Sequence, residues 1–242
     1  MFTIFVAIDL SGGRVVRLLR GDPAAATVYG EDPVATARSW QDGGATFLHV
    51  VDLDGAIRGQ PANAAVIEQI LRSVDIPVEV AGGIRSVEAI GRWLDAGAAR
   101  VCVGTRAIDE EFLDAALGRY GDGVVAAMDA RGGTVQVAGW QSSSALSTGE
   151  VLGRLARAGA PRVLFTDIGR DGTLEGPNLD ATREVLDAGM GVIASGGVSG
   201  VGDIEALVGL GHPRLEGVVV GKALYSGAVT LADALAAAAK GA

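Results

Sequence analysis

The sequence Ala-Ile-Asp-Leu-Ser-Gly-Gly-Arg-Val occupies residues 7–15, and Ala-Met-Asp-Ala-Arg-Gly-Gly-Thr-Val occupies residues 127–135. Both follow the pattern Ala-x-Asp-x-x-Gly-Gly-x-Val, and they are 129 − 9 = 120 positions apart in a chain of 242 residues. In each copy an apolar run leads to one aspartate and then to a glycine turn, which is typical of a buried strand whose last side chain reaches a rim. We therefore expect Asp9 and Asp129 to lie on opposite sides of a shared pocket.

The same unit of apolar strand, turn and helical segment recurs eight times. Nearly continuous runs of valine and isoleucine are typical of parallel strands that are covered on both faces. The expected strands cover residues 4–9, 47–52, 78–80, 101–103, 124–129, 162–166, 192–194 and 217–220, with short extended returns over 14–19 and 134–137. Eight such units predict an α/β protein with a (β/α)8 TIM barrel, and a doubly wound sheet is the alternative.

Two further pairs of segments extend the internal repeat. Residues 80–84 match residues 194–198, and residues 101–105 match residues 218–222. We interpret the chain as two half-barrels in tandem, about residues 1–121 and 122–242. Because no linker composition separates them, we count residues 1–242 as a single domain.

Composition and charge exclude several classes of protein. The net charge of −9 argues against general binding to nucleic acid or to anionic membranes. The single cysteine leaves no intrachain disulfide, and two histidines leave little room for a zinc site, so we expect no metal. The sequence shows neither a signal peptide nor an apolar run of eighteen residues, which predicts a cytoplasmic protein.

Glycine turns follow the third and fourth expected strand of each half. Gly82-Gly83 with Gly104-Thr105 would form one cradle, and Gly196-Gly197 with Gly221-Lys222 would form its partner across the barrel mouth. Glycine lets the backbone approach a phosphate closely, and the following helix N-terminus offers N–H groups. One such cradle is explained equally well by turn chemistry. Two of them predict a small-molecule substrate that carries a phosphate at each end.

Three aspartates are candidates for acid and base catalysis. Asp9 and Asp129 form the symmetric pair, and paired carboxylates in different environments can supply an acid and a base. Asp171 and Gly172 follow the sixth strand, and the Thr166 hydroxyl is placed to orient a carboxylate. The structural alternatives are that the paired aspartates cap turns and that Asp171-Gly172 is only a turn.

The remaining candidates come from the loops. Trp140 stands in a polar loop that we expect to be flexible, where its ring can stack on a heterocycle or dock on the rim. Arg17 and Arg85 are expected to contact a phosphate or a carboxamide. We interpret other notable residues as structural: His49 as a wall residue, Asp52 and Asp54 as salt-bridge partners in loop two, and Cys102 and Trp93 as packing.

These motifs together resemble the phosphoribosylformimino-aminoimidazole-carboxamide ribotide isomerases of histidine biosynthesis (HisA). The resemblance covers the whole chain and rests on residues 7–9, 13–18, 48–56, 82–85, 139–140, 166–168, 170–173, 195–197 and 221–224. It implies a barrel with an internal half-barrel repeat and an Amadori rearrangement of an aminoaldose to an aminoketose. It also implies a substrate with two phosphates, a monomer and no metal or organic cofactor.

The resemblance further implies roles for the aspartates. Asp9 is the general base that takes the ribose C2 proton. A second aspartate is the general acid that protonates the furanose ring oxygen, so that the ring opens to a Schiff base. Asp129 is the symmetric choice and Asp171 is the alternative, because its loop can close over the substrate.

Three alternatives remain beside this interpretation. The related cyclase usually carries cysteine before the first aspartate and Val-Lys-Gly after the turn, where this chain has Ala7 and Val16-Arg17-Leu18, which disfavours it. Bifunctional isomerases that also serve tryptophan synthesis place an arginine just before the Gly-Trp of loop five, where this chain has Val137-Ala138, although Asn178 fits them. The last alternative is a barrel that binds a bisphosphorylated ligand without catalysis.

Overall fold

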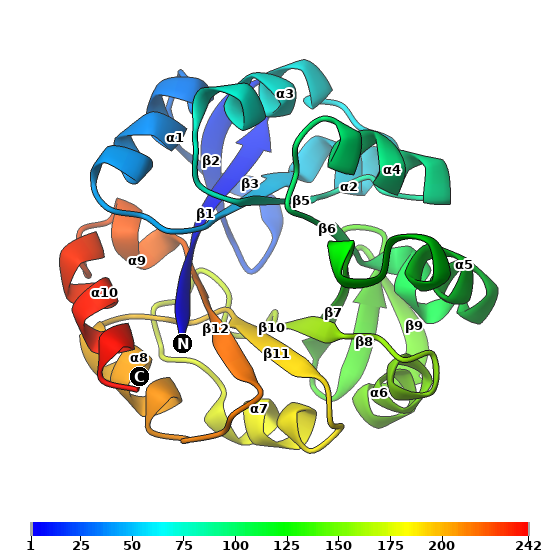
Figure 1. Ribbon diagram of the computed structural model, residues 1–242. Coiled ribbons are helices and arrows are strands. Elements are labelled where there is room, and N and C mark those ends of the chain that lie inside the picture. The colour runs from blue at the N-terminus through cyan, green and yellow to red at the C-terminus, as the bar shows by residue number, and fades with distance from the viewer. Residues whose placement is uncertain (1, 242) are drawn as a thin grey trace.

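Eight parallel strands close into a barrel in the computed structural model, which describes residues 2–241 (Figure 1). Each strand pairs with the next in chain order, and the last pairs with the first, so the ring is closed. The barrel strands are β1 (Thr3–Ser11), β4 (Leu48–Asp52), β5 (Val78–Ala81), β6 (Arg100–Val103), β7 (Val124–Arg131), β10 (Arg162–Asp167), β11 (Gly191–Ser195) and β12 (Leu215–Val220). The predicted (β/α)8 barrel is confirmed, and the alternative of an open doubly wound sheet is wrong.

Helices surround the barrel on its outer face (Figure 1). The longer ones are α1 (Pro33–Asp42), α3 (Ala64–Ser73), α4 (Val87–Asp95), α5 (Glu110–Tyr120), α6 (Thr148–Arg157), α7 (Leu179–Leu186), α8 (Val201–Val208) and α10 (Leu231–Ala239). Shorter ones are α2 (Leu53–Arg58), α9 (Lys222–Tyr225) and the 3₁₀ turns η1 (Thr105–Ile108) and η2 (Gly121–Gly123). The helices α1, α4 and α10 are capped by Asp32, Ser86 and Thr230, whose side chains each accept a hydrogen bond from the backbone N–H three residues later.

Two antiparallel hairpins extend from the barrel at equivalent places. After β1 the chain forms β2 (Arg14–Leu19) and β3 (Asp22–Gly30), and after β7 it forms β8 (Thr134–Val137) and β9 (Ser142–Ser147). The strands β2 and β8 were expected, whereas β3 and β9 were not. The prediction of a flexible loop around Trp140 is therefore wrong in part. Pairing with β2 and β8 outweighs the weak strand propensity of the alanine- and serine-rich segments.

Hydrogen bonds repeat between the two halves of the barrel. In β1 Asp9 lies opposite Val16, and in β7 Asp129 lies opposite Gln136. Asp52 at the end of β4 accepts a hydrogen bond from the Asn63 side chain. Asp167 at the end of β10 accepts one from Asn178. These pairs have the same offset, since 167 − 52 and 178 − 63 both equal 115, which supports the predicted duplication; the boundary near residue 121 stays a prediction.

Alternating side chains divide the core into two parts. One set packs between the strands and the outer helices and includes Ile4, Val6 and Ile8 of β1. The other set fills the barrel interior with residues from facing strands. This interior set consists of Phe5, Ala7, Cys102, Val125, Leu164, Ile193 and Val219. Because these side chains fill the interior, this part of the barrel is a packed core and not an open pore.

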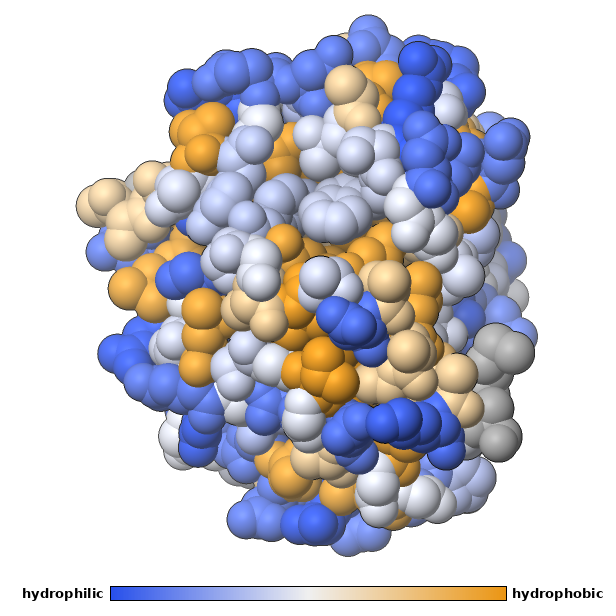
Figure 2. All heavy atoms as spheres, turned by 90° about the vertical axis from the view of Figure 1, so that its left-hand side faces the viewer, coloured by the Kyte–Doolittle hydropathy of each residue, from blue (hydrophilic) through white to orange (hydrophobic). Residues whose placement is uncertain are grey.

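The outer surface mixes residue types as a helical shell should. Figure 2 shows the side of the barrel around α1, α9 and α10, where hydrophilic residues cover the upper and lower parts and apolar residues gather between them. Within residues 2–241, none of the helices has the length and hydropathy needed to cross a bilayer.

Gly217 in β12 gives a direct test of barrel packing. A Cβ at this position would overlap the carbonyl of Thr3 in the paired strand β1. Overpacking of this kind typically costs 1–3 kcal/mol. We therefore expect Gly217→Ala to lower Tm by on the order of 5 °C in a thermal melt, given about 2–4 °C per kcal/mol for a domain of this size.

The matched control is Gly118→Ala in α5, where a Cβ would meet nothing within 4 Å. Alanine in a helix is favoured over glycine by roughly 0.5–1 kcal/mol, so this variant should be as stable as the parent or more so. Equal melting temperatures for the two variants would contradict the close approach of β12 and β1.

Candidate active site

A cavity of about 180 Å³ opens at the carboxyl end of the barrel strands. This end is where the loops after each strand converge and where barrel enzymes carry their active sites. Eleven of the predicted site residues line it: Asp9, Arg17, Gly82, Gly83, Arg85, Gly104, Thr105, Asp129, Trp140, Thr166 and Asp171. The structure therefore brings predicted site residues from both halves of the chain together around one cavity.

A second, smaller hollow adjoins the cavity on the side of the later strands. It is lined by the other five predicted residues, namely Gly172, Gly196, Gly197, Gly221 and Lys222. Both hollows are lined by Arg17 and Asp171, and also by Ser195 and Val219, which were not among the predicted site residues. A long ligand could therefore extend from one hollow into the other past these shared groups.

Asp9 forms a buried ion pair with Arg17. The Arg17 Nη1 lies 2.7 Å from the Asp9 Oδ2, and the two side chains are 8% and 14% exposed, respectively. The contact is an ion pair and not an aligned hydrogen bond, because neither Nε nor Nη1 of Arg17 has an acceptor in a hydrogen-bonding position within residues 2–241. Burial alone would lower the pKa of Arg17, but the charges of Asp9 and Asp171 raise it. Arg17 thus stays cationic between two carboxylates.

Asp129 lies across the cavity from Asp9 at the end of β7. Burial raises the pKa of its carboxyl group, while the side chains of Trp140 and Thr166 lie within hydrogen-bonding reach and lower the pKa again. Thr166 lies beside Asp129 because β10 pairs with β7 in this register. The predicted orientation of a carboxylate by Thr166 therefore applies to Asp129.

Asp171 has the most strongly shifted carboxyl group at the site. Burial raises its pKa to about 6, against a lowering by the Arg17 charge and a further rise from the carboxylates of Asp9 and Asp129. The ordinary value for aspartate is 3.8. This group can therefore hold a proton at a pH where most carboxyl groups have lost theirs.

The loop that carries Asp171 is covered by the hairpin of the other half. The Arg20 N–H donates a hydrogen bond to the Asp171 carbonyl at 3.1 Å. Gly172 lies so close to the hairpin that a Cβ on it would overlap the Leu18 carbonyl oxygen. The Lys222 Nζ donates to the Gly172 carbonyl at 2.7 Å. The hairpin tip and the Asp171 loop together form a roof over the adjoining hollows.

Trp140 completes this roof from the second half. Its backbone has φ +68°, a left-handed conformation, in a run with Ala138 and Gly139. The Thr105 Oγ1 accepts a hydrogen bond from the Ala138 N–H at 2.9 Å, which fixes the start of this turn. A Cβ on Gly21 would overlap the Trp140 ring, so only a glycine lets the first hairpin approach the indole so closely.

The glycine turns have matching backbone conformations in the two halves. Gly82 and Gly196 have φ of +97° and +93°, in the region that favours glycine. Gly104 and Gly221 each start a four-residue helical turn, η1 or α9, with ψ of −92° and −97°. The structure thus places the two predicted cradles as equivalent pairs at the two sides of the barrel mouth.

Several residues interpreted as structural behave as expected. Cys102 and Trp93 are buried. Asp52 and Asp54 do hold loop two, but through hydrogen bonds from backbone N–H groups and from Asn63 rather than through the expected salt bridges. These carboxylates receive so many N–H donors that no cation is needed beside them.

His49 is a buried wall residue with a partner that sequence reasoning missed. Its Nδ1 lies 2.7 Å from the Glu79 Oε1 on the neighbouring strand β5. The available signal was one carboxylate in the apolar run 78–80. Its pairing with His49 depends on the register of β4 and β5, which the sequence does not reveal.

Comparison with known proteins identifies related chains along almost the full length. A family model described as "Histidine biosynthesis protein" matches residues 3–230. Curated relatives named 1-(5-phosphoribosyl)-5-((5-phosphoribosylamino)methylideneamino) imidazole-4-carboxamide isomerase are similar to this chain. The relative from Desulforudis audaxviator is 50% identical over 96% of this chain and 90% of its own length. The relative from Pelotomaculum thermopropionicum is 52% identical over 96% of this chain and 91% of its own length. The relative from Rubrobacter xylanophilus is 51% identical over 98% of this chain and 97% of its own length.

Proposed function

Because this chain belongs to the histidine biosynthesis protein family, we propose that it catalyses the aldose–ketose isomerisation for which its relatives are named. The substrate is the phosphoribosylformimino derivative of 5-aminoimidazole-4-carboxamide ribonucleotide, and the product carries a phosphoribulosyl group instead. The observation that supports this proposal most directly is the arrangement of Asp9, Asp129 and Asp171 around one cavity that lies between two glycine cradles.

The proposed reaction is an Amadori rearrangement that needs one acid and one base. The acid protonates the furanose ring oxygen, the C1–O bond breaks and a Schiff base forms between C1 and the amino nitrogen. The base then removes the C2 proton to give an enolamine. This intermediate becomes the aminoketone when C1 gains a proton and the C2 hydroxyl loses one. Each proton transfer contributes on the order of 10²–10⁴ in rate when the catalytic group is well positioned.

Asp9 is the proposed base and Asp171 the proposed acid. The Arg17 guanidinium lies 2.7 Å from the Asp9 carboxylate and holds it at the cavity wall, where it can meet the ribose. The pKa of Asp171, raised to about 6 by burial, favours a form that still carries a proton to donate. Asp129, the other candidate acid, has hydrogen-bond donors near its carboxylate and is assigned an orienting and electrostatic role.

The two glycine cradles are the proposed sites of the substrate phosphates. Gly82, Gly83, Gly104 and Thr105 would bind one phosphate, with Arg85 beside it, through backbone N–H groups. The equivalent residues Gly196, Gly197, Gly221 and Lys222 would bind the other. Binding at both ends fixes the ribose between the aspartates, which is how remote binding energy supports catalysis.

The proposed chemistry uses side chains of this chain alone, without a metal or an organic cofactor. The cytoplasmic location, the monomeric state and the absence of nucleic-acid binding stay predictions from the sequence. Trp140 is proposed to stack on the imidazole of the substrate, because its ring lines the cavity beside Asp129.

Steady-state kinetics with two phosphoribosyl substrates test the proposed function. We expect turnover of the imidazole carboxamide substrate, with kcat/KM for phosphoribosylanthranilate lower by at least about 10²-fold. The reason is that Val137 and Ala138, which precede Gly139-Trp140, offer no cation to the anthranilate carboxylate. Comparable kcat/KM values for both substrates would instead support a bifunctional isomerase.

A further inference from the structure

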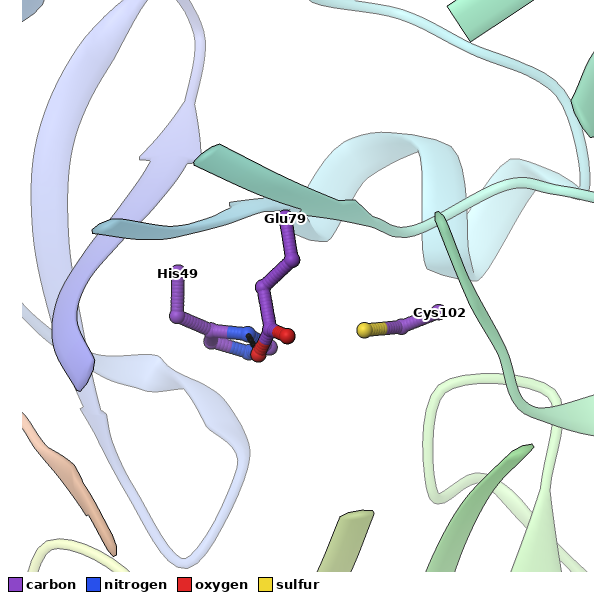
Figure 3. A group of neighbouring side chains, drawn as sticks. All are labelled: His49, Glu79 and Cys102. Atoms are coloured by element: carbon purple, nitrogen blue, oxygen red, sulfur yellow. Dashed lines mark hydrogen bonds and ion pairs between the residues drawn. The ribbon is translucent and has the colours of Figure 1, made fainter. Parts of the chain in front are cut away.

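Three potential metal ligands meet at the floor of the cavity, below the proposed catalytic aspartates. His49, Glu79 and Cys102 come from the neighbouring strands β4, β5 and β6, and Figure 3 shows their side chains directed toward one another. The His49 Nδ1 and the Glu79 Oε1 are 2.7 Å apart. One ligand atom from each residue lies within 4.8 Å of the other two.

The carboxylate of this cluster is only half satisfied. Glu79 is fully buried, and its Oε1 contacts His49. Its Oε2 is buried without a hydrogen-bond partner among residues 2–241. An unsatisfied oxygen of a buried carboxylate is costly, so it points to a group that binds there.

Cys102 supplies a sulfur atom beside this carboxylate. Its side chain is buried and lines the cavity, and its Sγ lies within 4.8 Å of ligand atoms of His49 and Glu79. A divalent metal ion deprotonates a coordinating thiol, so this sulfur can act as a thiolate ligand.

We propose that His49, Glu79 and Cys102 bind one divalent cation of the Zn²⁺ class. An imidazole nitrogen, a carboxylate oxygen and a thiolate sulfur are ligands that Zn²⁺ prefers, at about 2.0–2.3 Å each. The ligand atoms lie within 4.8 Å of one another. Side-chain shifts of about 1 Å would bring them to the spacing of a tetrahedral site. A thiolate and a carboxylate also neutralise the ion, and the thiol proton is released to solvent.

The cavity supplies both an entry path and a fourth ligand position. His49 and Cys102 line the cavity, so an ion can reach them from the barrel mouth and keep a water on that side. The Asp129 carboxylate lines the same cavity as His49 and Cys102. If the proposed isomerase function holds, Zn²⁺ at this floor should inhibit the reaction, because its charge acts on the catalytic carboxylates.

Metal binding by the full chain tests this site without substrate. We would remove metals with a chelator, dialyse the protein against micromolar Zn²⁺ and measure the bound metal per chain. We expect one ion per chain, and in the Co²⁺-loaded protein a thiolate-to-cobalt charge-transfer absorption. Cys102→Ala should abolish that absorption, and both Cys102→Ala and the isosteric Glu79→Gln should weaken binding at least tenfold.

His212 provides the matched control because it is the other histidine of the chain. It lies half-buried just before the turn that leads into β12, and His212→Gln should leave both the stoichiometry and the absorption unchanged. Absence of stoichiometric metal, or binding unchanged by Cys102→Ala and Glu79→Gln, would overturn the proposal. Either result leaves the isomerase proposal standing, because that proposal is tested by turnover of metal-free protein.

Discussion

Replacement of Asp9 by asparagine is expected to lower kcat for the imidazole carboxamide substrate by about 10³-fold, because an amide cannot accept the ribose C2 proton. Asparagine keeps the volume and the hydrogen-bonding shape of the side chain, so the cavity should keep its form. The substitution removes the Asp9 charge, and Asp171 then remains as the other carboxylate near Arg17. Steady-state kinetics and calorimetric titration with substrate give kcat and Kd separately.

The measured Kd shows whether the Asp9→Asn variant still binds the substrate. Substrate affinity should stay within about tenfold of the parent value, because the proposed phosphate cradles lie on other loops. Asp180→Asn, a change at an exposed carboxylate in α7, should leave both kcat and Kd unchanged. If Asp9→Asn retained more than a tenth of the parent kcat, the assignment of Asp9 as base would be wrong. A parent protein that binds the substrate without any turnover would support the binding-only alternative.

Asp171→Asn is expected to reduce kcat by about 10²–10³-fold and, at neutral pH, to raise the stability of the folded protein. The loss of activity follows from removal of the proposed acid. The gain follows from the raised pKa, since the charged form of Asp171 is less favourable in the fold than in the unfolded chain. A shift from 3.8 to about 6, reduced for the partial exposure of this side chain to the cavity, corresponds to a gain of about 1–2 kcal/mol.

The pH dependence of both effects has a defined direction. The protonated form of Asp171 stabilises the fold fully below the unfolded pKa of 3.8, and this contribution is lost as the pH rises through about 6. The Tm advantage of Asp171→Asn should thus be present at pH 8 and absent at pH 4. In the parent enzyme kcat/KM should fall as the pH rises through about 6, because the free enzyme loses the acidic proton. A variant that is both active and no more stable at pH 8 would contradict this assignment.

The internal repeat made the barrel predictable from the sequence. The eight apolar runs, the glycine turns and the strand-end aspartates are local signals. They recur at an offset near half the chain, which identifies the segments of the two halves that correspond to each other. The strands β3 and β9 were not predictable, because alanine- and serine-rich segments become strands only through pairing with β2 and β8.

The chemistry of the site was predictable only in part. Residue types and spacing collected Asp9, Asp129 and Asp171, but the choice between the last two depends on burial and on neighbouring charges. Likewise, the contact of His49 with Glu79 depends on the register of two parallel strands. Both properties arise from segments that are distant in sequence, so local patterns carry no information about them.

The hydrogen bond from the Arg20 N–H to the Asp171 carbonyl joins the roof of the cavity to the residue that we assign as the acid. Burial is the main reason why that carboxyl group holds its proton. A change that exposed this group to water would lower its pKa toward the ordinary value of aspartate. The hairpin of one half of the chain thereby helps to set the proton affinity of a group that the other half carries.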